Sequence, residues 1–270
     1  MPILHIAILA LVQGITEFLP ISSSGHLVLV PTLLAWPDQG LGIDVAVHVG
    51  TLGAVLLYFW RDTAALATGF WRTLKGNGRR DPGARLLYLL AVASVPVFVA
   101  GVLIDAYLEP LLRNLEIIGW TMLGFGIVLW ISDRIGLTVR RIEHLGLGDA
   151  ILIGLAQALA LIPGTSRAGI TMSAARILGI ERSEAARFSM LLSIPAIIGA
   201  GTLKGIDLYR AHDAVMLADS IMAAVMALLA ALVAIGLLMA WLKRATFTPF
   251  VIYRILLGGG LLALSYGWFA

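Results

Sequence analysis

The sequence predicts an all-α polytopic membrane protein, with six transmembrane helices plus two re-entrant helix pairs in an inverted-topology repeat. The chain of 270 residues is 60% hydrophobic and only 13% charged. Six apolar stretches reach the roughly 20 residues that a helix needs to cross a bilayer. Two further apolar regions are interrupted near their middle by proline and small polar residues. Such interruptions are typical of broken or re-entrant membrane helices.

The six predicted spans follow one another without a polar domain between them. We place them at 44–60, 86–104, 116–133, 185–204, 219–242 and 248–268. No polar stretch is long enough for an extramembrane domain, so residues 1–270 are interpreted as a single integral membrane domain. The first residues carry neither a charged segment nor a small-residue cleavage site, so we predict no removable signal peptide.

Composition narrows the range of functions and partners. The chain has no cysteine, which excludes disulfides and thiolate metal sites. The net charge is +3 with a pI of about 9.4. We interpret the basic residues as topology determinants and contacts for anionic membrane lipids. Nothing in the sequence supports nucleic-acid binding.

The two interrupted regions, 3–36 and 149–180, resemble each other. Pro20 is followed by Ile-Ser-Ser-Ser-Gly, and Pro163 by Gly-Thr-Ser-Arg-Ala-Gly. Aligning the two prolines also aligns an Ala-Ile-Leu triplet upstream of each. The half-segments beside each proline are too short for a full span, so each region is predicted to be a re-entrant helix pair.

Each interrupted region is followed by three predicted spans, and an odd number inverts the second copy relative to the first. The internal repeats are therefore expected at about 1–133 and 149–270, with the functional site at their interface.

Loop charges agree with an inverted repeat. The segment 61–85 carries six Arg and Lys residues, 134–144 carries three arginines, and 243–244 is Lys-Arg. The alternate loops, 105–115 and 205–218, are poorer in basic residues. The positive-inside rule places the first set in the cytoplasm and both termini outside. The first re-entrant pair then opens outward and the second inward.

The first break holds the densest group of polar residues. Gln13 and Glu17 are four residues apart and share one face of a helix. A second helix is expected to begin within Ser22–Ser24, because Ser is a preferred N-cap. The free N–H groups of this helix N-terminus, including that of Gly25, and the three hydroxyls form a predicted phosphate site.

A nucleophile and a base lie close together in the same break. His26 follows Ser23 by three residues, within one helical turn, and could take the proton of that hydroxyl. Glu17 could orient His26, or could hold a divalent cation together with Gln13. Mg²⁺ and Ca²⁺ both take carboxylate, amide and phosphate oxygens.

The second break supplies a strong cation. Arg167 is the only Arg or Lys in 149–175, and a planar guanidinium suits bidentate phosphate binding. Thr165 and Ser166 stand at the turn and are predicted phosphate ligands. If the two breaks meet near the midplane, Arg167 faces Ser23. This set of groups fits phosphoryl transfer.

These motifs closely resemble the signatures of bacterial undecaprenyl-diphosphate phosphatases, the bacitracin-resistance family. The likeness includes the run from Gln13 to His26 and segments 163–167 and 185–195, and it extends over nearly the whole chain. It implies a multi-pass hydrolase of the bacterial inner (plasma) membrane with an outward-facing site and a divalent cation. The reaction converts undecaprenyl diphosphate to undecaprenyl phosphate and inorganic phosphate, which recycles the lipid carrier of peptidoglycan synthesis. Ser23 matches the residue proposed as nucleophile.

A transporter of lipids or ions is the alternative, since inverted repeats with broken helices are common in transporters. The pair of Ser23 and His26 favours the enzyme, because transport needs neither group. Two mechanisms stay open, attack by Ser23 and attack by a water that His26 activates. The lipid chain length and the oligomeric state, with a homodimer among the alternatives, also stay open.

Overall fold

The computed structural model describes residues 2–37, 40–78, 80–105, 114–210 and 214–268. Within these ranges every regular element is helical, apart from one isolated parallel bridge between Arg140 and Ile180. The helices are α1 (Ile3–Thr16), α2 (Ser23–Leu34), α3 (Gly40–Tyr58), α4 (Trp60–Leu74), α5 (Pro82–Asp105), α7 (Leu115–Ile135), η1 (Ile142–His144), α8 (Leu147–Ala158), η2 (Leu159–Leu161), α9 (Arg167–Ile177), α10 (Arg182–Arg210), α11 (Ala214–Leu242) and α12 (Thr248–Ser265). The all-α prediction is confirmed.

Four helices of the described chain are long and apolar enough to cross a membrane, namely α5, α7, α11 and α12. They coincide with four of the six predicted spans, although α12 ends three residues before the predicted end at 268. The predicted span 44–60 lies mostly in α3, which meets α4 at an angle of 90° and counts as a fifth span if the bent pair is taken together. The predicted span 185–204 lies within α10, which is not among these candidates.

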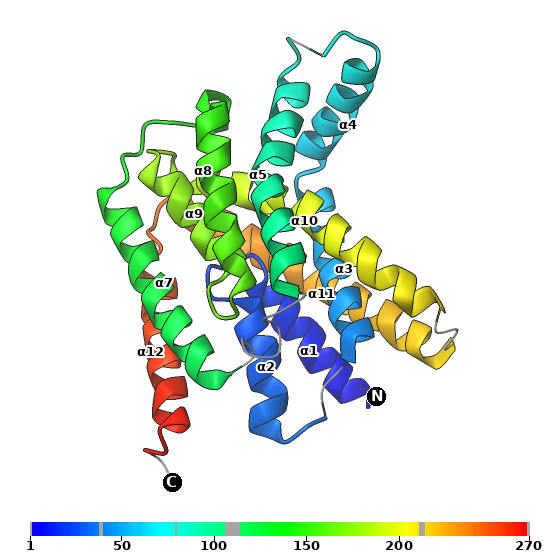
Figure 1. Ribbon diagram of the computed structural model, residues 1–270, viewed down its shortest axis with the longest axis vertical. Coiled ribbons are helices and arrows are strands. Elements are labelled where there is room, and N and C mark those ends of the chain that lie inside the picture. The colour runs from blue at the N-terminus through cyan, green and yellow to red at the C-terminus, as the bar shows by residue number, and fades with distance from the viewer. Residues whose placement is uncertain (1, 38–39, 79, 106–113, 211–213, 269–270) are drawn as a thin grey trace.

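Both proline-containing breaks separate two short helices. In Figure 1, α1 and α2 form a hairpin that opens toward the end of the molecule bearing both termini. The hairpin of α8 and α9 opens toward the opposite end, where α4 lies. The turns that contain Pro20 and Pro163 both lie in the middle of the molecule, where the site is built.

Close helix contacts through small residues fix the two hairpins in the bundle. Gly14 of α1 packs on α11, where an added Cβ atom would lie 2.6 Å from the carbonyl oxygen of Ala227. Gly154 of α8 packs on α5, where a Cβ would lie 2.5 Å from the carbonyl oxygen of Ala93. Small residues let membrane helices approach closely, so any larger side chain at either glycine would push a hairpin out of place.

The end of the bundle opposite the termini is joined by buried ion pairs. Asp133 at the end of α7 accepts from Arg176 Nε at 3.2 Å and from Arg182 Nε at 2.6 Å. Its other oxygen accepts from the backbone N–H of Phe247 at 3.1 Å. One carboxylate therefore connects α7, α9, α10 and the start of α12.

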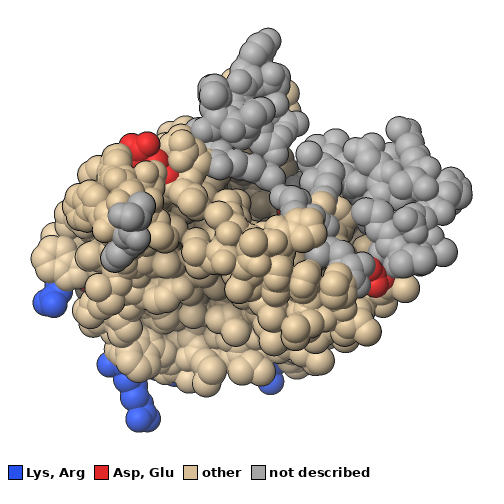
Figure 2. Space-filling model, turned by 90° about the horizontal axis from the view of Figure 1, so that it is seen from below, with Lys and Arg blue, Asp and Glu red and all other residues tan. Residues whose placement is uncertain are grey.

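The two ends of the molecule differ in the charge of their surfaces. Figure 2 views the end that bears both termini, and the coloured part of the face is mostly uncharged, with Lys and Arg only near its margin. The basic segment 61–85 lies toward the other end, around α4 and the start of α5 (Figure 1).

Candidate active site

The end of α1 supplies a carboxylate and an amide on one helical face. Gln13 Nε2 donates to Glu17 Oε2 at 2.8 Å, which confirms that these side chains share a face. Gln13 is fully buried, and the side chain of Glu17 is only 5% exposed. A carboxylate at this depth needs charged or hydrogen-bonding partners, and the neighbouring elements provide them.

The start of α2 brings the serine run to this carboxylate. Ser22 is the N-cap, as predicted, and its Oγ accepts from the N–H of Gly25 at 3.4 Å. Its φ is 74°, a left-handed value that is costly for a residue with a side chain. The helix then begins with Ser23, and Ser24 follows on the exposed side, 3.3 Å from Ser22 Oγ.

The start of α9 repeats the same local structure. Ser166 is the N-cap with a φ of 70°, and its Oγ accepts from the N–H of Gly169 at 3.1 Å. The structural counterpart of Ser22 is therefore Ser166, whereas the alignment on the two prolines pairs Ser166 with Ser23. The two alignments differ because two residues separate Pro163 from its N-cap, whereas one residue separates Pro20 from its N-cap. In the corrected register Ser23 corresponds to Arg167.

Glu17 joins the two breaks. Its Oε2 accepts from Ser23 Oγ at 2.7 Å, and its Oε1 accepts from Arg167 Nη2 at 2.6 Å. The arginine side chain is 16% exposed. Hydroxyl, carboxylate and guanidinium thus form one cluster from residues that lie up to 150 positions apart. Arg167 was predicted to face Ser23. In the structure both side chains bind the carboxylate of Glu17, one on each oxygen.

Both ring nitrogens of His26 are hydrogen-bonded to groups other than the Ser23 hydroxyl, so the interpretation of His26 as the base for Ser23 was wrong. Its Nδ1 lies 2.6 Å from the carbonyl oxygen of Ser22, and its Nε2 lies 2.5 Å from the hydroxyl of Tyr253. The ring turns back along α2 and stacks against Tyr253. Glu17 does not orient His26 either. Glu17, rather than His26, stands in the position of a base for Ser23.

The second break places its remaining polar groups around Arg167. Arg167 Nη1 also donates to the carbonyl of Ser189 at 3.4 Å. Thr171 is hydrogen-bonded to the carbonyl of Arg167 at 2.8 Å and lies 2.7 Å from Ser189 Oγ. Thr165, a predicted phosphate ligand, is fully buried, and its hydroxyl has no partner in the described chain.

Three residues near the cluster were not found from the sequence. His48 of α3 brings its Nε2 within 3.7 Å of Glu17 Oε2. Tyr253 of α12 holds His26, and Ser189 of α10 contacts Arg167. All three come from helices whose packing on the breaks no local motif reveals. A polar residue within an otherwise apolar span is the one signal that could have singled them out.

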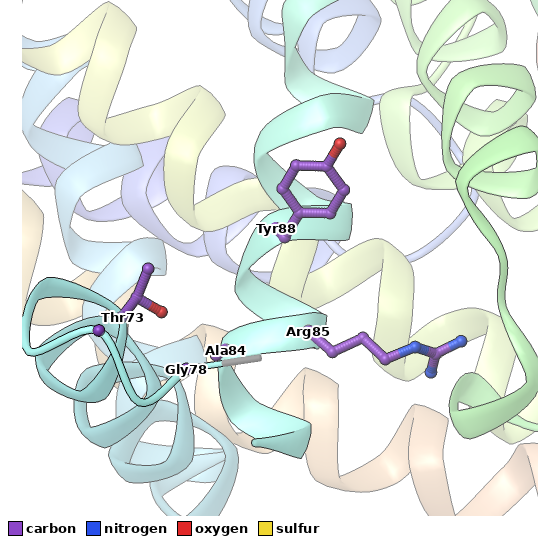
Figure 3. A pocket seen from close by; sticks show the side chains of 6 residues that line it. Thr73, Gly78, Ala84, Arg85 and Tyr88 are labelled. Atoms are coloured by element: carbon purple, nitrogen blue, oxygen red, sulfur yellow. The ribbon is translucent and has the colours of Figure 1, made fainter. Parts of the chain in front are cut away.

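A hollow of about 510 Å³ lies elsewhere, at the turn between α4 and α5. Its lining includes Thr73, Arg85 and Tyr88. In Figure 3 the side chain of Arg85 extends toward the segment before α8, where it binds the carbonyls of Glu143 and Leu145. None of the residues that line this hollow belongs to the cluster of Ser23, Glu17 and Arg167, so the hollow is separate from the phosphate site.

The fold and the cluster define a multi-pass membrane protein with a buried Ser–Glu–Arg group at two facing helix N-termini, which is suited to act on an anionic group. The family follows from comparison with known proteins. The model of the bacitracin resistance protein BacA family matches residues 6–260, and the chain belongs to this family.

Relatives of the chain carry a common name. It is 55% identical to undecaprenyl-diphosphatase 1 of Rhodospirillum rubrum, over 98% of this chain and 96% of the relative. It is 51% identical to the undecaprenyl-diphosphatase of Roseobacter denitrificans and 52% identical to that of a Jannaschia species, each over 98% of this chain and 100% of the relative. The resemblance seen in the motifs therefore extends over the full chain.

Proposed function

We propose that this chain hydrolyses undecaprenyl diphosphate to undecaprenyl phosphate and inorganic phosphate in the bacterial inner membrane. The observation that carries the proposal is the Glu17 carboxylate, bound to the hydroxyl of Ser23 on one oxygen and to Arg167 on the other. The names of its relatives give the substrate. The lipid tail lies against the apolar helices, and the diphosphate enters between the two breaks.

Ser23 is the nucleophile in the proposed reaction. Its Oγ attacks the terminal phosphorus while its proton passes to Glu17 Oε2, 2.7 Å away. The bond from phosphorus to the bridging oxygen breaks, and undecaprenyl phosphate leaves. Water then attacks the phosphoserine, the bond from phosphorus to Ser23 Oγ breaks, and inorganic phosphate leaves with the protons of the water. Ser23 Oγ regains its own proton from Glu17. A nucleophile beside a base is the general arrangement for such covalent catalysis.

Arg167 couples substrate binding to this base. In the structure its guanidinium is paired with Glu17 at 2.6 Å, which weakens the carboxylate as a base. An incoming phosphate competes for the same donors, because guanidinium binds phosphate and carboxylate in the same bidentate manner. As Arg167 turns to the phosphate, it releases Glu17 Oε1, while Oε2 stays beside Ser23 to take the hydroxyl proton.

His26 serves the site through the N-cap. Its Nδ1 lies 2.6 Å from the carbonyl of Ser22 and its Nε2 is held by Tyr253. Both ring nitrogens are therefore engaged away from Ser23. In our proposal His26 fixes the strained start of α2, so that the backbone N–H groups of this helix point at the phosphate.

A divalent hard cation, Mg²⁺ or Ca²⁺, is part of the proposal. Gln13 Oε1 is a buried acceptor without a partner in the described chain, next to Glu17. No group of three or more His, Asp or Glu side chains suited to a metal occurs among the described residues. The donors fit a cation held by Gln13, Glu17 and the diphosphate oxygens together, as Mg²⁺ often binds. Such a cation would neutralise charge on the diphosphate.

The proposed topology has six spans and two re-entrant pairs, with both termini and the site facing outward. Three observations support it. The hairpins of α1–α2 and α8–α9 open toward opposite ends (Figure 1). Their N-caps, Ser22 and Ser166, have the same left-handed backbone. The basic segment 61–85 lies at the end away from the termini, as the positive-inside rule requires of a cytoplasmic loop.

Phosphate release from undecaprenyl diphosphate by the purified chain tests the function. We expect turnover by the wild type and by Ser94→Ala, which removes a buried serine that bonds only its own helix in the described chain. Ser23→Ala should fall to background. No phosphate release by folded wild-type protein would overturn the proposal and favour a transporter built on the same repeats.

A further inference from the structure

Arg254 is a buried cation that the proposed reaction does not use. It lies in α12, next to Tyr253, and none of its surface is exposed. Its nitrogens donate to five main-chain carbonyls. These are Met122 (3.1 Å), Thr121 (3.3 Å), Pro20 (3.2 Å), Gly164 (3.0 Å) and Thr165 (3.0 Å).

The carbonyls that Arg254 binds belong to both breaks. Pro20 lies in the turn between α1 and α2, two residues before the N-cap Ser22. Gly164 and Thr165 form the turn before the other N-cap, Ser166. One side chain from the end of the sequence therefore connects the two turns that carry Ser23 and Arg167.

The two N-caps are the residues that most need external support. Ser22 and Ser166 hold φ values of 74° and 70°, and such backbone persists only where the surroundings fix it. Arg254 binds the carbonyl of Thr165, directly before Ser166, and the carbonyl of Pro20, two residues before Ser22. The five donors of a guanidinium are fixed in one plane, so Arg254 sets the position of one turn relative to the other.

The charge of Arg254 has a second consequence. All of its hydrogen bonds within the described chain go to carbonyl oxygens, none to a carboxylate. Carbonyl dipoles solvate a guanidinium without neutralising it. Its positive charge therefore adds to the two helix N-termini beside it, and together they favour an anion between the breaks.

We propose that Arg254 is a positioning residue for phosphoryl transfer, which holds both breaks in register and makes the site between them positive. The inference rests on the proposed function for its kinetic part. It predicts that geometry and charge can be separated, because a lysine at position 254 keeps the charge but cannot bind carbonyls on both breaks at once.

Two substitutions at this position are compared with wild type in detergent. Arg254→Lys should lower kcat about 100-fold, the cost of a small misplacement of reacting groups, and should leave the affinity for inorganic pyrophosphate nearly unchanged. Arg254→Gln should lose kcat to a similar degree and also weaken pyrophosphate binding about tenfold. Wild-type kcat in Arg254→Lys would overturn the proposal.

Arg176→Gln is the matched control for loss of a buried arginine. Arg176 is equally inaccessible and also binds main-chain carbonyls, but these lie at the other end of α9. It should lower the melting temperature with little change in kcat or pyrophosphate affinity. The proposal would also be overturned if the Arg176 and Arg254 variants lost the same fraction of activity for each degree of lost melting temperature. Arg254 would then affect activity only through the stability of the fold.

If the Arg254 variants do not fold, two smaller substitutions in α7 test the same proposal. A Cβ on Gly126 would lie 3.1 Å from Arg254 Cβ, whereas a Cβ on Gly124, two residues earlier in α7, meets nothing within 4 Å. Gly126→Ala should lower kcat several-fold, and Gly124→Ala should not. Equal kcat in both would refute the positioning role. If wild type releases no phosphate, the proposed function fails, and the pyrophosphate affinities still test Arg254.

Discussion

Removal of Arg167 should cost both stability and activity. In Arg167→Ala the Glu17 carboxylate, 5% exposed, keeps the hydrogen bonds from Gln13 and Ser23 and the nearby ring of His48. Breaking a buried ion pair costs about 3–5 kcal/mol, and the two remaining hydrogen bonds reduce this. We expect a loss of about 2–3 kcal/mol, which corresponds to a fall in melting temperature of roughly 4–10 °C.

The double variant separates an unpaired charge from a lost contact. Glu17→Gln with Arg167→Ala removes both charges, so its melting temperature should exceed that of Arg167→Ala alone. The interaction free energy in this double-mutant cycle should be about 1–3 kcal/mol. Thermal unfolding in detergent measures stability, and phosphate release measures activity.

Activity should not recover in the double variant. Arg167→Ala should lose nearly all turnover and Arg167→Lys most of it, because lysine keeps the charge but not the planar fork. Near-normal turnover by Arg167→Ala at an unchanged protein level would refute the phosphate-binding role. Strictly additive stability effects would refute the buried ion pair.

Three further outcomes follow. A cysteine introduced at Asn77, in a chain that has none, should resist impermeant reagents in intact cells; its labelling would overturn the topology. Excess chelator should abolish turnover, and Mg²⁺ or Ca²⁺ should restore it; full activity in chelator would remove the cation. Burial raises the pKa of Asp149. Hydrogen bonds from Arg140 and from the Gly146 N–H lower this pKa by a larger amount in total, so it falls below the usual value. Asp149 therefore stabilises the fold above its unfolded pKa, and that contribution is lost as the pH falls through the folded pKa. Asp149→Asn should lower the melting temperature at neutral pH by an amount worth about 1 kcal/mol and make no difference in acid, whereas an equal effect at both pH values would contradict this.

Local signals predicted the parts of the site that depend on neighbours in sequence. The serine run marked the start of α2, because an N-cap needs only its own side chain and the following N–H groups. The spacing of Gln13 and Glu17 gave a shared face for the same reason. The break at Pro163 and the place of Arg167 directly after its turn were also readable.

Contacts between residues far apart in the sequence could not be predicted from local patterns. Tyr253 lies 227 positions from His26 in the sequence, so no local pattern could show that its hydroxyl engages Nε2 of this ring. The 90° bend between α3 and α4 falls at Phe59, where neither proline nor glycine marks a break. Arg254 lies within the predicted span 248–268, but no local motif sets it apart, and only the structure shows that both turns meet at its guanidinium.

The central claim is that Ser23 attacks phosphorus with Glu17 as its base. Rapid quench of the wild type with undecaprenyl diphosphate labelled in the terminal phosphate measures this directly. We expect transient label on the protein at Ser23, none in Ser23→Ala, and turnover at background in that variant. Clear turnover by Ser23→Ala, with no label on the wild type, would contradict it and assign the attack to water.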